Sequence, residues 1–133
     1  GCDNFTTRYL INDACVQRGL PNVHGSIYQF EGHVGVFSAS SKAPCYRCLH
    51  PVPPPAEMAP NCAEAGVLGV LPGIIGTTQA IETLKLLLEL GSPLIGRLGQ
   101  YDARAGTWRD LKIRKDPKCP GCGRSEEATE QSA

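Results

Sequence analysis

The order of hydrophobic and polar positions divides the chain into a helix, a β-hairpin, a proline-rich stretch, a long apolar segment and a second hairpin. Apolar side chains such as Phe5, Tyr9 and Val16 recur at helical spacing near the start. Gly19 follows the last of them, and a glycine in that place commonly ends a helix. The pattern predicts a helix over residues 4–19.

Two pairs of short runs are rich in β-branched and aromatic residues, as is typical of strands. VHGSIYQF and HVGVFSAS flank Glu31-Gly32, and RLGQYDAR and TWRDLKIR flank Ala105-Gly106. Short glycine-containing loops between such runs favour hairpins. We expect hairpins over residues 23–38 and 97–113.

Residues 64–90 form a long apolar segment that predicts a helix. Through Ile75, apolar side chains fall on nearly every face, which indicates a buried helix. Further along, Glu82, Lys85 and Glu89 predict a solvent-facing side. Pro72 should kink or restart the helix, because proline removes a backbone hydrogen bond.

Glycines recur every three or four residues in this segment and would leave a groove that another backbone can approach closely. They are Gly66, Gly69, Gly73 and Gly76. A central core helix and a subunit interface both explain such a segment.

Residues 40–60 contain more than half of the chain's eleven prolines. This composition predicts an irregular, exposed loop. The polar residues 124–133 lack large apolar side chains, so we expect them to be disordered. Residues 1–123 are then long enough to form one domain.

Formal charges balance, with 13 basic and 13 acidic residues, which argues against a nucleic-acid or membrane-surface partner. The uncharged stretch at residues 65–81 falls short of the roughly 20 residues that span a bilayer. Seven cysteines, an odd number, suit a reducing compartment better than a disulfide scaffold. We expect a soluble, cytoplasmic protein.

Two Cys-X-X-Cys pairs, Cys45 with Cys48 and Cys119 with Cys122, match the four thiolates of a structural zinc site. Joining the two pairs closes a long loop at a cost of roughly 4 kcal/mol, which zinc binding at roughly 10 to 16 kcal/mol exceeds. A redox pair or two disulfides are the alternatives. A redox pair should open a helix after a strand, whereas Cys45 precedes a proline-rich loop.

Cys62 stands between the proline-rich loop and the start of the predicted long helix. A helix N-terminus favours the thiolate and a loop gives access, so Cys62 is a candidate nucleophile. Packing beneath the helix is the alternative. For Cys2 and Cys15, packing explains the residues without further chemistry.

Five segments, in order, resemble the downstream half of the ubiquitin-activating-type adenylyltransferases. They are GCDNFTTRYLIND, PCYRC, CAEAGVLGVLPGIIG, YDARAGTWRDLKIRKDP and CPGC. The chain is most similar to the ThiF/MoeB-like branch, the molybdopterin-synthase adenylyltransferases and their sulfurtransferase-fused relatives. The resemblance implies an α/β fold, the downstream half of a Rossmann-like unit, with a mixed sheet, helices and a zinc site of four cysteines.

The resemblance also implies an activity and partners. Such enzymes use ATP and Mg²⁺ to adenylate the C-terminal glycine of a ubiquitin-like sulfur carrier, in molybdenum cofactor synthesis or tRNA thiolation, and are commonly homodimers. Asp3 is similar to the residue that holds Mg²⁺ and the phosphates, with Asn4 beside it. Arg8 lies one helical turn beyond Asn4 and could face the same pocket. Cys62 matches a cysteine that forms a thioester or acyl disulfide with the carrier in some members.

The family's glycine-rich ATP loop is not found in these residues, and no G-X-G-X-X-G motif occurs. Backbone amides of that loop would cradle the phosphates. We therefore expect the chain alone to be inactive and to require an upstream nucleotide-binding half of the same protein. Two alternatives remain open: a zinc-stabilised module that binds a ubiquitin-like partner without catalysis, and a redox protein.

Overall fold

A computed structural model describes residues 2–38, 40, 42–55 and 65–123. Helix α1 spans Phe5–Arg18, in agreement with the prediction from helical spacing. The side-chain oxygen of Asn4 accepts a hydrogen bond from the Thr7 backbone N–H at 2.7 Å and so caps the first turn. Gly19 ends the helix with a φ of 65°, a left-handed conformation that glycine adopts without strain.

Four strands form one sheet in the order β1-β2-β3-β4. Strand β1 spans Asn22–Tyr28, β2 Glu31–Phe37, β3 Arg97–Asp102 and β4 Thr107–Lys112. The three ladders are antiparallel, and isolated parallel bridges join Gln29 to Val67 and Val36 to Ile95. Both predicted hairpins are confirmed, as is the mixed α/β class.

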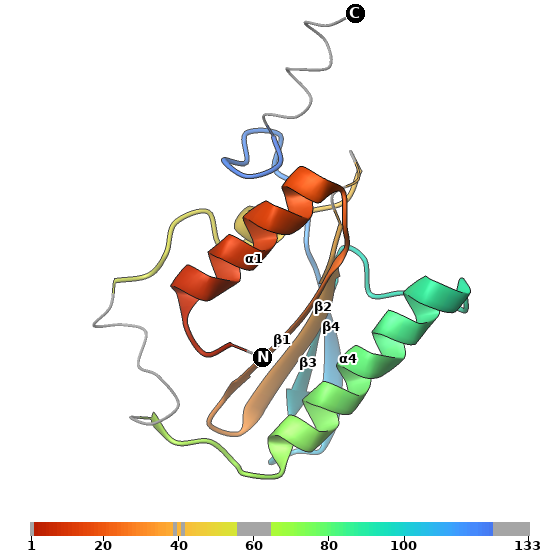
Figure 1. Cartoon of the computed structure of the whole chain (residues 1–133). Coiled ribbons are helices and arrows are strands. Elements are labelled where there is room, and N and C mark those ends of the chain that lie inside the picture. Colours follow the sequence, from red (N-terminus) through yellow and green to blue (C-terminus); the bar gives the residue numbers. More distant parts are fainter. Residues whose placement is uncertain (1, 39, 41, 56–64, 124–133) are drawn as a thin grey trace, which may run out of the picture.

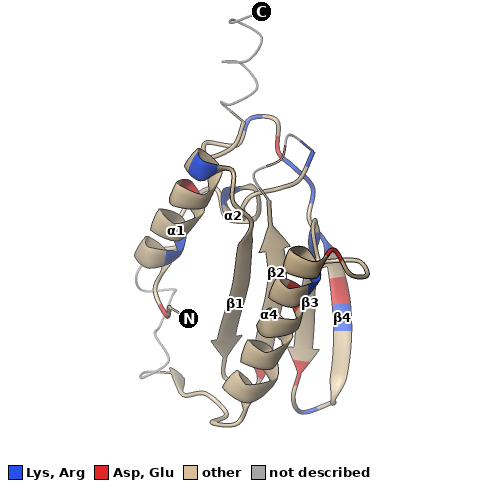
Figure 2. Ribbon diagram, turned by 45° about the vertical axis from the view of Figure 1, so that its right-hand side comes forward, with Lys and Arg blue, Asp and Glu red and all other residues tan. Residues whose placement is uncertain are grey.

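Helices α1 and α4 cover opposite faces of the sheet. Alternate residues of a strand point to opposite faces, and on β2 the side chain of Val34 packs under α4 whereas that of Phe37 packs against Tyr9 of α1. Figure 2 shows β1 between the two helices. Each face of the sheet therefore has its own small core.

Helix α4 spans Leu71–Leu88, so the predicted helix over residues 64–90 is too long at its start. Residues 66–70 are not helical, and the Leu68 backbone N–H donates to the Gln29 carbonyl at 2.9 Å instead. Pro72 lies in the first turn of α4, where proline costs no hydrogen bond. The expected restart at Pro72 is therefore confirmed (Figure 1).

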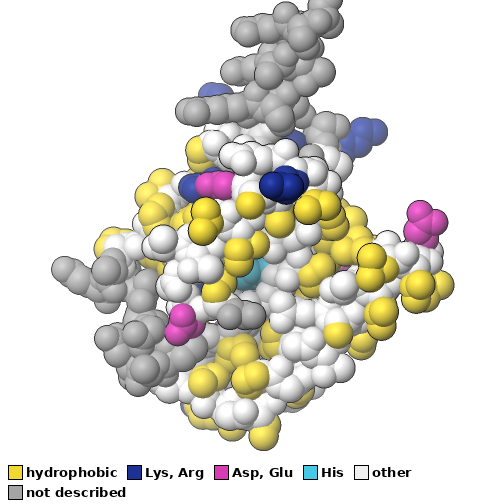
Figure 3. All heavy atoms as spheres, viewed as in Figure 1, with side chains coloured by type: hydrophobic (Ala, Val, Ile, Leu, Met, Phe, Trp, Pro, Cys, Tyr) yellow, Lys and Arg dark blue, Asp and Glu magenta, His cyan; other side chains and the backbone are white. Residues whose placement is uncertain are grey.

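The predicted solvent-facing side of this helix is wrong for Glu82, whereas Glu89 is exposed as expected. Glu82 is only 2% exposed and accepts hydrogen bonds from the Lys85 ammonium at 2.7 Å and the Leu94 backbone N–H at 2.8 Å. The outward face carries Ile81, Leu84 and Leu87, the last 73% exposed. Glu82 thus holds the loop before β3 through Leu94. The outside of α4 carries hydrophobic side chains instead (Figure 3).

The proline-rich stretch is more ordered than its composition predicts. A short helix, α2, spans Tyr46–Leu49. Ala43 and Tyr46 are buried, because this segment packs against α1 and β2. The expectation of an irregular, exposed loop is wrong for these residues. Residues 56–64, including Cys62, and the predicted disordered tail at residues 124–133 lie outside the described residues.

Candidate functional site

The four cysteines of the two Cys-X-X-Cys pairs meet at one point. Cys45 caps α2 and Cys48 lies within it, and the chain after β4 returns to bring Cys119 and Cys122 alongside. All four Sγ atoms lie within 4.8 Å of one another. The Sγ atoms are 3.6 Å apart for Cys45 and Cys119 and 3.4 Å apart for Cys48 and Cys122.

These distances fit a metal ion and not disulfides. A disulfide joins sulfurs at about 2.05 Å, and none of the four cysteines forms one. Zn–S bonds of about 2.3 Å in a tetrahedron place sulfurs roughly 3.8 Å apart, close to the observed spacing. The donor set, four thiols on two tight turns, could hold a metal ion.

Burial opposes the ionisation of two of these thiols. Burial raises the pKa of Cys45 and of Cys122. Burial alone would raise that of Cys119 too, but hydrogen bonds from the backbone N–H groups of Cys122 and Gly121 outweigh it and lower its pKa. Thiolates are the ligands that zinc binds, so a divalent ion would stabilise the charge that burial disfavours.

Glycines shape the second turn. A Cβ on Gly123 would lie 2.6 Å from the Pro117 carbonyl oxygen, and one on Gly121 would lie 2.9 Å from the Arg47 side chain and 3.3 Å from Cys45 Sγ. The atoms that a Cβ on Gly123 would meet belong to the backbone, which cannot move aside as a flexible side chain can. The glycine-rich sequence after Cys119 is therefore required for the two turns to close on each other.

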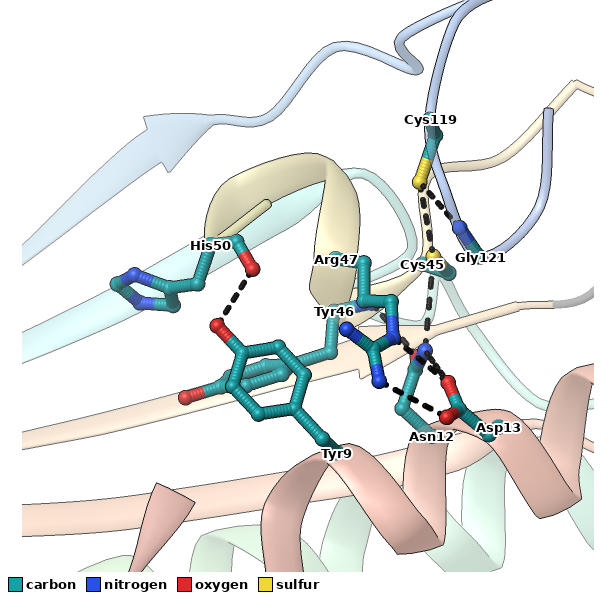
Figure 4. A network of polar contacts seen from close by, with 9 residues as sticks. All are labelled: Tyr9, Asn12, Asp13, Cys45, Tyr46, Arg47, His50, Cys119 and Gly121. Carbon is teal, nitrogen blue, oxygen red and sulfur yellow. Dashed lines mark hydrogen bonds and ion pairs between the residues drawn. The ribbon is translucent and has the colours of Figure 1, made fainter. Parts of the chain in front are cut away.

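Helix α1 is clamped to the first turn by two neighbouring residues. The Asp13 carboxylate accepts two hydrogen bonds from the Arg47 guanidinium, at 2.8 and 2.9 Å. These bonds lower the pKa of Asp13. The guanidinium also stacks on the Tyr9 ring, 4.3 Å from its centroid. Asn12, 1% exposed, contacts both Cys45 and the Tyr46 backbone (Figure 4).

A second site lies at the other end of α1. A hollow of about 590 Å³ is lined by Cys2, Asp3 and Arg8, by β1 and by the first turns of α4. Arg8 Nε is buried and has no hydrogen-bond partner among the described residues, while its Nη2 donates to the Cys2 carbonyl at 3.4 Å. Asp3 and Arg8 both line this hollow, and their roles toward a nucleotide and Mg²⁺ stay predictions from the sequence.

The sequence-predicted residues do not all converge. Asn4 is beside Asp3, but its side chain is engaged in capping α1 and does not line the hollow. The four clustered cysteines lie near the opposite end of α1, so they take no part in this hollow.

Sequence reasoning missed an aromatic and imidazole cluster between the two sites. His24 of β1 packs 5.0 Å from the Tyr46 ring, which in turn lies 5.1 Å from the His50 ring. Burial, then the positive charge of Arg8, lowers the pKa of His24 to about 3. The imidazole is thus neutral at physiological pH. Alternation along the strand places His24 on the same face as the polar residue Ser26. The sequence pattern therefore did not indicate this burial of His24.

Comparisons with known proteins agree with the fold and the motifs. The ThiF family model matches residues 1–121. The chain is 54% identical over 125 residues to a sulfur carrier protein adenylyltransferase of Thermus thermophilus, covering 91% of the chain and 46% of the relative. It is 51% identical to a SAMP-activating enzyme E1 of Haloferax volcanii, covering 91% of the chain and 44% of the relative. The protein called adenylyltransferase and sulfurtransferase MOCS3 from Sus scrofa is 46% identical, covering 96% and 28%.

Solved structures show the same fold at low sequence identity. Escherichia coli MccB with ATP aligns with a TM-score of 0.70 at 13% identity, covering 90% of this chain and 37% of MccB. The chain spans less than half the length of each of these relatives. No helix in the described residues is long and apolar enough to cross a membrane. The chain belongs to the ThiF family.

Proposed function

We propose that the chain is the downstream half of an ATP-dependent adenylyltransferase that activates the C-terminal glycine of a ubiquitin-like sulfur carrier, in molybdenum cofactor synthesis or thiolation. The observation that carries this proposal is the hollow that holds Asp3 and Arg8 beside β1. In the described sheet β1 is an edge strand. An upstream half could therefore pair with β1 and close the hollow from its open side, which would place its ATP loop beside Asp3.

The residues of the hollow fit this chemistry. Bound ATP supplies the adenylyl group that makes the carrier's terminal carboxylate reactive, with pyrophosphate as the product. Asp3 offers an exposed carboxylate, the hard oxygen ligand that Mg²⁺ prefers. Arg8 lines the same hollow, and its guanidinium charge favours an anion there, either a phosphate or the carrier's carboxylate. Gly25 of β1 also lines the hollow, and a Cβ added to it would collide with the Gln79 amide.

Partners follow from the same arrangement. The apolar outside of α4, exposed in this chain, suits burial against a second copy in a homodimer or against the upstream half. The zinc site would be structural, since Asp3 and Arg8 are on a separate surface. A cytoplasmic location and the covalent role of Cys62 remain predictions from the sequence. The chain alone would be inactive, since the ATP loop belongs to the upstream half.

ATP–pyrophosphate exchange with the purified carrier tests this function in the protein that includes the upstream half. Asp3→Ala should abolish exchange while zinc content and folding stay unchanged, because Asp3 holds the metal at the phosphates. Asp110→Ala is the matched control, since Asp110 lies on edge strand β4 and pairs with Arg97 at 3.0 Å. Near-normal exchange in Asp3→Ala would contradict the proposal. Carrier binding without exchange in the unmodified protein would favour a non-catalytic binding module.

A further inference from the structure

Asn12 is a buried polar residue in the middle of α1, and its side-chain atoms have partners on both sides. Its Oδ1 accepts a hydrogen bond from the Tyr46 backbone N–H at 2.8 Å. Its Nδ2 contacts Cys45 Sγ at 3.7 Å and Asp13 Oδ1 at 3.4 Å. A buried amide is costly without such partners, so the position is selected by its contacts rather than by its helix propensity.

The contacts fix which way the amide points. Reversing it would set the oxygen against a sulfur that is negative when metal is bound, and the NH₂ group against the Tyr46 N–H. Both pairs would repel. The side chain therefore presents a donor to the sulfur and an acceptor to the backbone next to it (Figure 4).

The donor to Cys45 differs in kind from donors to other cysteines of the site. Cys48 Sγ accepts from the Asp116 backbone N–H at 3.5 Å, and Cys119 Sγ accepts from the Gly121 backbone N–H at 3.4 Å. Those donors belong to the turns themselves. Asn12 comes from a separate helix, so its bond joins the metal-binding turn to α1.

We propose that Asn12 is a positioning residue of the metal centre, holding the Cys45 thiolate and the Tyr46 backbone in place and thereby linking metal binding to α1. The proposal rests on zinc in the four-cysteine site and is independent of the adenylation activity. Four thiolates around a divalent ion leave a net charge of about −2, which N–H donors stabilise. Arg8 lies one turn before Asn12 on the same helix, so the metal also steadies the helix that carries the nucleotide-side residues.

Metal binding by the whole chain tests this role directly. Asn12→Leu keeps the number and branching of the side-chain heavy atoms and removes the hydrogen bonds to Cys45, Tyr46 and Asp13. We expect zinc affinity, measured by chelator competition, to fall roughly 10- to 100-fold, the range found when an outer partner of a metal ligand is lost. With Co²⁺ as the probe, the sulfur-to-cobalt charge-transfer bands should shift, because the Cys45 sulfur loses a donor.

Asp13→Asn is the matched control on the next residue. It weakens the ion pair with Arg47 but leaves the Asn12 amide bonded to Cys45, so zinc affinity should change less than about threefold. Affinity and cobalt spectrum of Asn12→Leu equal to those of the unmodified chain would overturn the proposal. An equal loss of affinity in Asp13→Asn would also overturn it, since the effect would then come from general loosening of α1.

A measurement on the unmodified chain does not depend on the folding of any variant. With ¹¹³Cd in the site, a hydrogen bond to a metal-bound sulfur gives a scalar coupling between the donor proton and the metal. We expect a cross-peak between cadmium and a side-chain amide proton of Asn12, beside those from the backbone N–H groups of Asp116 and Gly121. Backbone cross-peaks without the Asn12 cross-peak would contradict the proposal, and so would a chain that binds no metal.

Discussion

Gly32→Ala tests how closely α4 packs on the sheet. Gly32 lies on β2 between Ile27 and Tyr101. A Cβ added there would collide with Cγ1 and Cδ1 of Ile75, on the buried side of α4. Ile75 is 2% exposed and its branched side chain is stiff at χ1, so it cannot swing aside. The substitution must move α4 or strain the core.

The expected magnitude follows from two opposing effects. Overpacking a core costs about 1–3 kcal/mol, whereas replacing glycine with alanine in a strand returns roughly 0.5–1 kcal/mol of backbone preference. We expect Gly32→Ala to lower the free energy of unfolding by about 1–2 kcal/mol, which lowers Tm by about 3–10 °C. Urea unfolding followed by circular dichroism measures the change, with zinc held in excess.

A double-mutant cycle and a control identify the cause. Ile75→Ala alone should cost about 2–5 kcal/mol, and adding Gly32→Ala should then cost little, because the new methyl group enters the vacated space. Gly73→Ala has no neighbour within 4 Å and should stabilise the helix by roughly 0.5–1 kcal/mol. Additive effects of Gly32→Ala and Ile75→Ala, or an unchanged stability in Gly32→Ala, would refute the close packing of α4 on Gly32.

Three further predictions address pH, assembly and Cys62. Burial lowers the pKa of His24 to about 3, so below about pH 6.5 the unfolded chain binds a proton at this residue and the folded chain does not. The free energy of unfolding therefore falls toward lower pH, by up to about 1.4 kcal/mol per pH unit. NMR should show no His24 titration between about pH 7.5 and 5, and a midpoint near 6.5 would contradict this prediction. Glu substitutions at Leu84 and Leu87, which are 53% and 73% exposed, should dissociate the proposed homodimer in sedimentation while leaving the chain folded, whereas an unchanged dimer would exclude this face as the interface. In the protein with its upstream half, Cys62→Ala should preserve adenylate formation and lower transfer from the carrier, and wild-type transfer rates without a trapped adduct would leave Cys62 a packing residue.

Local patterns in the sequence predicted the elements whose order is set locally. Helix α1 has its apolar spacing within the helix, and its cap at Asn4 and its terminal glycine, Gly19, directly flank it. Each hairpin joins strands through a short turn. The Cys-X-X-Cys spacing predicted the four-cysteine cluster because each turn presents two sulfurs together, and the geometry bears this out.

Features that depend on distant partners could not be predicted in the same way. The orientation of α4 is an example, because both of its sides carry apolar residues. The helical pattern also does not reveal that Glu82 accepts a hydrogen bond from a backbone N–H in the loop before β3. The burial of Asn12 similarly depends on Tyr46 and Cys45, which lie far along the chain. Residues 66–70 leave the helical path because Gln29 offers a backbone carbonyl to Leu68.

The metal centre joins the middle of the chain to its C-terminal part, and X-ray absorption at the zinc edge tests it most directly. We expect one zinc per chain with four sulfur neighbours at about 2.3 Å, contributed by Cys45, Cys48, Cys119 and Cys122. Metal-free protein that remains folded with four titratable thiols, or a zinc shell containing oxygen or nitrogen in place of sulfur, would contradict this expectation.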